Sequence, residues 1–130
     1  MQMVIDSSAI LAVLLHEPER GALVAATEKA VLIAPASTPW EIGNALVAGW
    51  RRKRLTLEDV AAAWDSFEDI PLRLVEVIVP RALRIATEYG LYAYDAYVLQ
   101  AALARGVPLL TLDQVLIRAA EQAGLPTVEI

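Results

Sequence analysis

Four carboxylates lie where apolar runs of the sequence give way to predicted helices: Asp6, Glu41, Asp95 and Asp113. Asp6 and Asp113 directly follow short aliphatic runs, and Glu41 lies in the first turn after Pro39. Asp95 opens a helical segment that is otherwise almost free of charge. If the aliphatic runs are strands of one parallel sheet, their carboxyl ends lie along one edge, and side chains there converge in one crevice.

Carboxylates gathered in one crevice repel each other, and a divalent cation relieves that repulsion. The chain has no cysteine and a single histidine, His16, so thiolate and histidine-cluster sites are excluded. Ligation by oxygen alone suits Mg²⁺ or Mn²⁺ rather than zinc, and these ions keep waters for a substrate phosphate and a nucleophile. The pattern therefore points to metal-dependent phosphodiester hydrolysis.

Each acid also has a purely structural explanation. Asp6 precedes Ser7 and Ser8, where it would cap the following helix, and an acid in a first turn complements the helix dipole. On that interpretation the chain is a catalytically silent interaction module. A phosphoacceptor receiver domain is a third possibility, but it needs paired acids early and a lysine after a late strand, and Lys29 and Lys53 are the only lysines.

The elements that must position these acids alternate along the chain. Short runs rich in aliphatic and β-branched residues predict parallel strands at Met3–Ile5, Val31–Ala34, Leu72–Val79, Pro108–Leu112 and Thr127–Ile130. Helical patterns fill the gaps at Ser7–His16, Pro18–Lys29, Pro39–Arg54, Leu57–Asp69, Arg81–Tyr89, Asp95–Arg105 and Gln114–Ala123. Strand–helix alternation predicts an α/β architecture.

Local signals mark several helix boundaries. Thr56 with Asp59 three residues later resembles a capping box, and Gly90, Gly106 and Gly124 follow helices as terminating glycines do. The helix that begins at Asp95 is apolar on almost every side, which indicates that it is buried or closes an oligomer interface.

The composition indicates one domain, residues 1–130, with a core of its own. Hydrophobic residues make up 57% of the chain, and we expect part of this apolar surface to meet a partner. No apolar run is long enough to span a membrane, and Met1–Asp6 has no signal-like character, so we expect a cytoplasmic protein without a membrane partner.

The net charge of −5 argues against a protein that coats nucleic acid through an overall positive field. A local basic cluster is nevertheless present in Arg51, Arg52, Lys53 and Arg54, and Arg81 and Arg84 share a second helix face. Both groups are candidates for contact with a phosphate backbone, and both also suit a solvated surface. Six aromatic residues could stack bases, although packing in the core or at an interface is the more common role of such residues: Trp40, Trp50, Tyr89, Tyr92, Tyr94 and Tyr97.

Four motifs carry a resemblance to a known family. In order along the chain they are Val4-Ile5-Asp6-Ser7-Ser8-Ala9, Glu41-Ile42-Gly43-Asn44-Ala45-Leu46, Tyr94-Asp95-Ala96-Tyr97 and Leu110-Thr111-Leu112-Asp113. Together they resemble the PIN-domain family, and especially the VapC-type ribonuclease toxins of type II toxin–antitoxin systems. The resemblance covers nearly the whole chain.

The resemblance implies a three-layer α/β/α fold with a central parallel sheet of four to five strands, and a homodimer that pairs with a cognate antitoxin. It also implies an endoribonuclease that uses Mg²⁺ or Mn²⁺ to hydrolyse single-stranded or looped RNA. By motif, Asp6, Glu41, Asp95 and Asp113 would be both the catalytic acids and the metal ligands. The segment Gln114–Ile117 supplies none of the further acids that some family members carry.

Supporting roles follow from the same motifs. Ser7 or Ser8 and Thr111 would be polar residues that support the acids. Asn44 lies three residues after Glu41 on the same helix face, where its amide would orient that carboxylate. Contact with RNA or with acids of the antitoxin would fall to the arginines: Arg51, Arg52, Arg54, Arg81 and Arg84.

Overall fold

The computed structural model describes all 130 residues and is built on a parallel sheet. Its four strands are β1 (Gln2–Ile5), β2 (Val31–Pro35), β3 (Leu72–Val75) and β4 (Leu109–Leu110), in the order β3-β2-β1-β4. All three neighbouring pairs are parallel, with Val4 opposite Ile33 and Ile5 opposite Leu110. The expected central parallel sheet is confirmed, with four strands.

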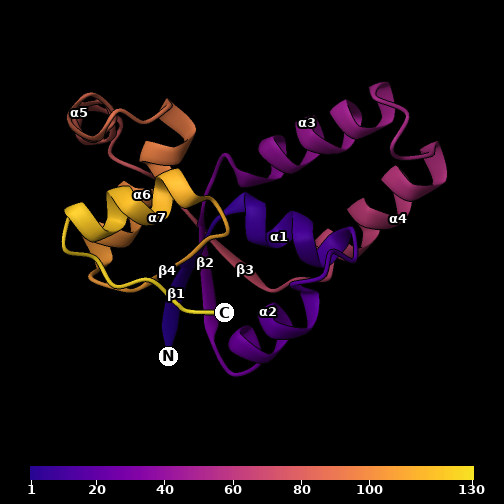
Figure 1. Cartoon of the computed structure of the whole chain (residues 1–130), viewed down its shortest axis with the longest axis horizontal. Helices are drawn as coiled ribbons and strands as arrows, with labels where there is room; N and C mark the ends of the chain where they lie inside the picture. Colours follow the sequence, from indigo (N-terminus) through magenta and orange to yellow (C-terminus); the bar gives the residue numbers. More distant parts are fainter.

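Seven helices connect and cover the strands: α1 (Ser7–Leu14), α2 (Arg20–Thr27), α3 (Thr38–Arg51), α4 (Leu57–Glu68), α5 (Val79–Tyr89), α6 (Ala93–Arg105) and α7 (Gln114–Gln122). Figure 1 shows α1 to α4 on one side of the sheet and α5 to α7 on the other. The expected three layers are therefore present. In the same view, α3 and α4 extend away from the sheet as a helical pair.

The alternation of side chains along β1 explains the two-sided core. Met3 and Ile5 belong to the apolar cluster under α1 to α4, whereas Val4 belongs to the cluster under α5 to α7. Successive residues of a strand point to opposite faces, so a run of consecutive apolar residues is what a doubly covered strand requires. Each fully buried aliphatic side chain contributes about 2 kcal/mol by removal from water.

Helix α6 is the buried helix that the sequence predicts. Its residues from Val98 to Ala102 are all buried, because α6 packs against β1 and β2 on one side and against α5 and α7 on others. Gln100 is the polar residue of this run, and its side-chain oxygen accepts a hydrogen bond from the backbone N–H of Ile78 at 3.1 Å. The interior of the domain therefore accounts for the apolar character of this helix.

Three predicted strands are too long, and the one predicted at Pro108–Leu112 is reduced to Leu109–Leu110. The third strand ends at Val75 rather than Val79, because Pro80 lies in the first turn of α5 and residues 76–78 form the connection to that helix. The fifth strand, predicted at Thr127–Ile130, is reduced to a single parallel bridge between Thr127 and Leu109. With β4 only two residues long, there is little edge for a fifth strand to pair with.

Helix boundaries agree with the local signals. Thr56 and Asp59 form the reciprocal capping box at the start of α4, and Pro39 occupies the first turn of α3. Gly90 and Gly106 end α5 and α6 with φ of +68° and +63°, a left-handed conformation that side chains with a Cβ rarely adopt. No helix combines the length and the apolar character that crossing a bilayer requires.

Candidate metal centre

The order of the strands defines where a site is expected. The chain runs from β1 outward to β2 and β3, and then returns to place β4 on the other side of β1. The carboxyl ends of β1 and β4 therefore flank a topological switch point, the place where open parallel sheets bind ligands. Asp6 follows β1 there, and Thr111 follows β4.

Asp6 is fixed by two hydroxyl groups. Its carboxylate Oδ2 accepts hydrogen bonds from Ser8 Oγ at 2.7 Å and from Thr111 Oγ1 at 2.8 Å. Asp6 and Thr111 are 4% and 3% exposed, and the backbone N–H of Asp6 is bonded to Leu110, which ties β1 to β4. The predicted support from Ser8 and Thr111 is thus visible as direct contacts, whereas Ser7 makes no side-chain hydrogen bond.

The same hydroxyls tie the β4–α7 turn to the centre. The backbone N–H of Asp113 donates to Thr111 Oγ1 at 3.0 Å, and the N–H of Leu112 donates to Ser8 Oγ at 3.1 Å. A hydroxyl that donates to Asp6 while accepting from the backbone has its proton direction determined. Ser8 and Thr111 therefore hold the carboxylate of Asp6 in one orientation relative to this turn.

Glu41 is held by a residue that the sequence did not suggest. Ser37 Oγ donates to Glu41 Oε2 at 2.9 Å, across one turn at the start of α3. Burial raises the pKa of Glu41, the Ser37 hydrogen bond opposes that rise, and the charges of Asp6 and Asp95 add to it. Asn44, which was expected to orient this carboxylate, is exposed and makes no hydrogen bond to Glu41.

Asp95 is the acid most affected by its neighbours. It is half-buried in the first turn of α6, and its carboxylate accepts no side-chain or capping hydrogen bond. Burial, followed by the charges of Asp6 and Asp113, raises its pKa from 3.8 to about 6. No basic side chain is among the groups that shift the pKa of Asp95 or Glu41.

These electrostatic effects connect the four acids. Asp6 influences both Glu41 and Asp95, Glu41 also responds to Asp95, and Asp95 responds to Asp113. The spacing is nevertheless open, because no group of three or more acidic side chains is drawn together closely enough to hold an ion. Repulsion between like charges favours such a separation. The structure brings the predicted acids to one end of the sheet without closing a coordination shell.

The capping explanation holds for one acid of the four. Asp113 Oδ1 accepts hydrogen bonds from the backbone N–H groups of Val115 at 2.9 Å and Leu116 at 3.4 Å at the start of α7. Asp6 occupies the equivalent position before α1, but its side chain makes no capping bond. The side chains of Glu41 and Asp95 make no capping bond either, but both acids lie in the first turn of their helices, where they complement the helix dipole as expected.

The donor set suits a hard divalent cation. It consists of carboxylate oxygens with hydroxyl groups behind them, and it contains no sulfur or imidazole. Oxygen donors with surplus negative charge are what Mg²⁺ and Mn²⁺ prefer in proteins. Asp6, Glu41 and Asp95 would be the residues that hold such an ion, with Asp113 at the border of the group.

A further carboxylate lies at the same edge of the sheet. Glu76 directly follows β3, and the register places Val75 opposite Pro35, next to the turn that leads to Ser37. The sequence shows the same signal as for Asp6, an acid after an aliphatic run. Extension of the predicted strand to Val79 placed Glu76 inside the strand and concealed that signal.

The basic residues lie outside the acidic centre. Arg51, Arg52 and Arg54 are exposed around the end of α3, and Arg81 and Arg84 are exposed on α5. The aromatic residues divide into two groups. Trp40, Trp50, Tyr92 and Tyr94 are 51–86% exposed, whereas Tyr89 and Tyr97 pack against the core.

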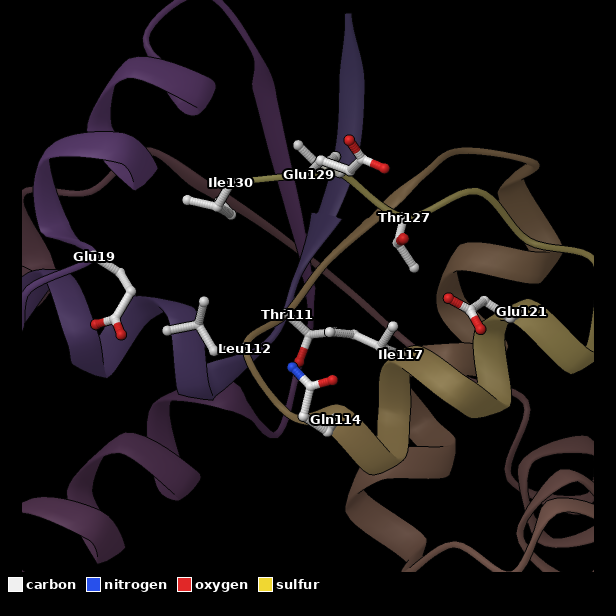
Figure 2. A pocket seen from close by; sticks show the side chains of 10 residues that line it. Glu19, Thr111, Leu112, Gln114, Ile117, Glu121, Thr127, Glu129 and Ile130 are labelled. Carbon is white, nitrogen blue, oxygen red and sulfur yellow. The ribbon is translucent and has the colours of Figure 1, made fainter.

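A hollow of about 520 Å³ lies behind the centre, on the side of α7 and the C-terminal segment (Figure 2). Thr111, Gln114 and Glu121 line it together with residues 127–130, and Figure 2 shows their side chains around the opening. None of the four predicted acids lines this hollow. The volume of this hollow therefore does not identify the metal centre. The hydrogen bonds of Asp6 locate that centre more directly.

Comparisons with known proteins agree with this geometry. The model of the PIN domain family matches residues 3–122. No curated protein matches the sequence. Among solved structures, PAE2754 from Pyrobaculum aerophilum is similar with 26% identity and a TM-score of 0.71, over 92% of this chain and 79% of that one.

Two further structures share the fold at lower identity. VapBC2 from Rickettsia felis, solved bound to a promoter DNA fragment, has 13% identity and a TM-score of 0.66, with 98% of each chain covered. VapC20 from Mycobacterium tuberculosis, a sarcin-ricin loop cleaving toxin, has 14% identity and a TM-score of 0.66, with 98% of this chain and 99% of that one covered. At these identities the likeness concerns the fold.

Proposed function

Since this chain belongs to the PIN-domain family, we propose that it is a metal-dependent endoribonuclease that hydrolyses RNA phosphodiester bonds as the toxin of a toxin–antitoxin pair. The proposal rests on the position and the hydrogen bonds of the Asp6 carboxylate. It lies at the switch point of the sheet, is held by Ser8 and Thr111, and caps no helix. A helix-capping role does not explain that arrangement.

The residues have distinct roles in the proposed reaction. Asp6, Glu41 and Asp95 bind Mg²⁺ or Mn²⁺, and the hydroxyls of Ser8 and Thr111 keep Asp6 oriented for that purpose. When bound, the cation supplies Lewis-acid activation of water and neutralises charge on the phosphate. Ser37 holds Glu41 in the same way from the start of α3. Asp113 fixes the start of α7 and adds negative charge beside Asp95.

Charge explains why substrate binding depends on the cation. With no basic side chain to offset them, the acids repel a phosphate backbone until a cation is bound. The exposed arginines at the end of α3 and on α5 then provide attraction outside the centre. In the proposal these are Arg51, Arg52, Arg54, Arg81 and Arg84, and they contact RNA or acids of the antitoxin.

The proposed partners are an antitoxin and a second copy of the chain. Several large apolar side chains are exposed, among them Trp40 on α3 and Leu83 on α5. Exposed apolar area of this kind commonly marks interaction surfaces. The similarity to VapBC2 and to VapC20, which is described as a toxin, supports the antitoxin as a partner.

The direct test is cleavage of RNA by the purified protein. We expect a labelled single-stranded RNA to be cut with Mn²⁺ or Mg²⁺, not with EDTA, and not by the Asp95→Asn variant. Sequencing the fragment ends would define the RNA sites. Cleavage that continues in EDTA, or that is unchanged in Asp95→Asn, would contradict the proposal. So would the absence of cleavage when both ions and a range of cellular RNAs have been tried.

A further inference from the structure

A second hollow, of about 350 Å³, opens beside the acidic centre. It lies between the β2–α3 turn, the β3–α5 connection and α6, and its lining includes Ser37, Glu76, Val77, Val79 and Tyr97. The volume is at the lower end of the range of small-ligand sites, about 300 to 1,000 Å³. The lining combines a carboxylate, an aromatic ring and aliphatic side chains.

This hollow adjoins the acidic centre through Ser37. Ser37 lines it and donates its hydroxyl to Glu41. Tyr97 lines it from α6, two residues after Asp95 and therefore on a different face of that helix, and its ring meets that of Tyr94 edge to face, with centroids 5.6 Å apart. A group in the hollow would lie beside Ser37, which holds the carboxylate of Glu41.

The walls of the hollow are fixed by hydrogen bonds of their backbone N–H groups. The backbone N–H of Ala36 donates to the carbonyl of Val75 at 2.8 Å, which joins the two strand ends. The N–H of Ile78 donates to Gln100 Oε1 at 3.1 Å, and Gln100 is 4% exposed within α6. A pocket that is preformed in this way loses little conformational entropy when a ligand enters.

The chemistry of the lining identifies a nucleobase as the occupant. Unpaired RNA bases are recognised by stacking on aromatic side chains and by hydrogen bonds to their edges. Glu76 is exposed at the rim, and an ionised carboxylate presents two acceptor oxygens and no donor. Among the four bases, only guanine presents two adjacent N–H donors, N1–H and N2–H, that match both oxygens at once.

We propose that this hollow is a base pocket that selects guanine next to the scissile phosphate, with Glu76 as the acceptor and Tyr97 as the stacking surface. The inference rests on the proposed ribonuclease function and names its substrate preference. Glu76 is a specificity-determining residue in this account and is not a metal ligand. Gln100 is a positioning residue, since it acts by holding the wall at Ile78.

The test measures binding separately from cleavage. Four labelled single-stranded heptanucleotides, each with a central G, A, C or U in an otherwise adenine context, are titrated with the Asp95→Asn variant in excess Mn²⁺ and followed by fluorescence anisotropy. We expect the G oligonucleotide to bind about 10-fold more tightly than the others. Equal binding of all four, or a preference for another base, overturns the proposal.

Variants of the pocket assign the preference to residues. In the Asp95→Asn background, Glu76→Gln should remove the preference for G, whereas Glu88→Gln removes the same charge from the exposed face of α5 and should keep it. In the otherwise unaltered chain, Glu76→Gln should leave Mn²⁺ affinity unchanged. A preference that survives Glu76→Gln, or a loss of Mn²⁺ affinity on that substitution, overturns the assigned role.

The stacking role of Tyr97 is tested with two substitutions that both keep a large apolar side chain, because its ring also packs against the core. Tyr97→Phe keeps the ring and should keep tight binding of the G oligonucleotide, whereas Tyr97→Leu should weaken it several-fold. Equal binding by the two variants, with thermal unfolding showing both folded, overturns the stacking role. If the G preference is found but the unaltered protein cuts no RNA, the pocket stands and the proposed ribonuclease function fails.

Discussion

Asp6 and Asp113 occupy equivalent places in the fold but use their side chains differently. Each follows a strand of the parallel sheet and immediately precedes a helix, α1 or α7. Asp113 accepts two backbone N–H groups and caps its helix, whereas Asp6 caps nothing and is held by Ser8 and Thr111. Position at a strand end therefore does not decide the role of an acid, and its hydrogen-bond partners do.

The difference has a geometric origin. Thr111 stands between the two acids, donating its hydroxyl to Asp6 and accepting the backbone N–H of Asp113. Its hydroxyl satisfies the buried Asp6 carboxylate without supplying a positive charge, so the surplus negative charge remains for a cation. Asp113 has part of its charge offset by the N-terminus of α7. A stable cap and a ligand in need of a cation can thus lie side by side.

The largest expected difference between Asp6 and Asp113 is in the rate of RNA cleavage after each is replaced by Asn. Asp6→Asn is expected to lower the rate of Mn²⁺-dependent RNA cleavage by about three orders of magnitude or more, because it removes a charged ligand from the centre. Asp113→Asn keeps an oxygen that can cap α7, and it should lower the cleavage rate less than Asp6→Asn does. Rates measured with saturating RNA compare the two variants, and similar losses in both would contradict the distinction.

Loss of the Thr111 hydroxyl should give the next largest effect. Thr111→Val is close in shape but removes both the donor to Asp6 and the acceptor for the Asp113 N–H. We expect Mn²⁺ affinity to fall about 10- to 100-fold, as when residues that orient metal ligands are removed. Thr111→Ser restores the hydroxyl and should recover most of that affinity in calorimetric titration. Unchanged affinity in Thr111→Val would show that the hydroxyl does not orient Asp6 for a cation.

The pH dependence of stability tests the charge at the centre. The pKa of Asp95 is raised to about 6, first by burial and then by the charges of Asp6 and Asp113. The native protein thus holds this proton more tightly than the unfolded chain, and the free energy of unfolding falls as pH rises from about 4 to about 6. Asp95→Asn removes the titrating group, and with it this decrease in the free energy of unfolding. With EDTA present at pH 7, the variant should be more stable by about 1 kcal/mol, a value reduced for the partial exposure of Asp95.

Urea unfolding of the wild type and Asp95→Asn at pH 4 and pH 7 checks this expectation. The two proteins should differ little at pH 4, where Asp95 is protonated in the native state, and diverge at pH 7. An Asn variant that is less stable than the wild type at pH 7 would indicate that Asp95 stabilises α6 rather than crowding a metal site.

The smallest effect concerns the cap. Asp113→Ala removes both hydrogen bonds to the start of α7 and should lower the free energy of unfolding by about 1 kcal/mol. Asp113→Asn should stay within about 0.5 kcal/mol of the wild type, since Asn caps helices as well as Asp does. Chemical unfolding with EDTA present measures both variants. Equal stability of the Ala variant and the wild type would remove the basis for treating Asp113 as a cap.

The sequence was sufficient to predict those strands and helix ends that are determined by local patterns of residues. The apolar runs at Val4 and Ile33 predict doubly covered strands, and Thr56 with Asp59 predicts the start of α4. These predictions succeed because the local pattern and the final packing favour the same structure. The family motifs also pointed to Ser7 or Ser8 and to Thr111 as support for the acids; that role stays a prediction, with Ser8 and Thr111 in contact with Asp6.

The partners of individual side chains could not be predicted in this way. Asn44 and Ser37 both have a helical spacing that reaches Glu41, and the sequence does not show that Ser37, four residues before Glu41, makes the contact. Glu76 was concealed because aliphatic residues continue past the end of β3, and Pro80 ends the strand through helix geometry rather than through a polar signal. Whether Asp113 is a cap or a ligand is likewise decided by partners that the sequence does not name.

The measurement that bears most directly on the central claim is a calorimetric titration of the purified protein with Mn²⁺ at pH 7, comparing the wild type with Asp6→Asn and Glu88→Gln. We expect saturable Mn²⁺ binding by the wild type and by Glu88→Gln, and none by Asp6→Asn at the same concentrations. No binding by the wild type, or equal binding by Asp6→Asn, would contradict the assignment of these acids to a divalent metal centre.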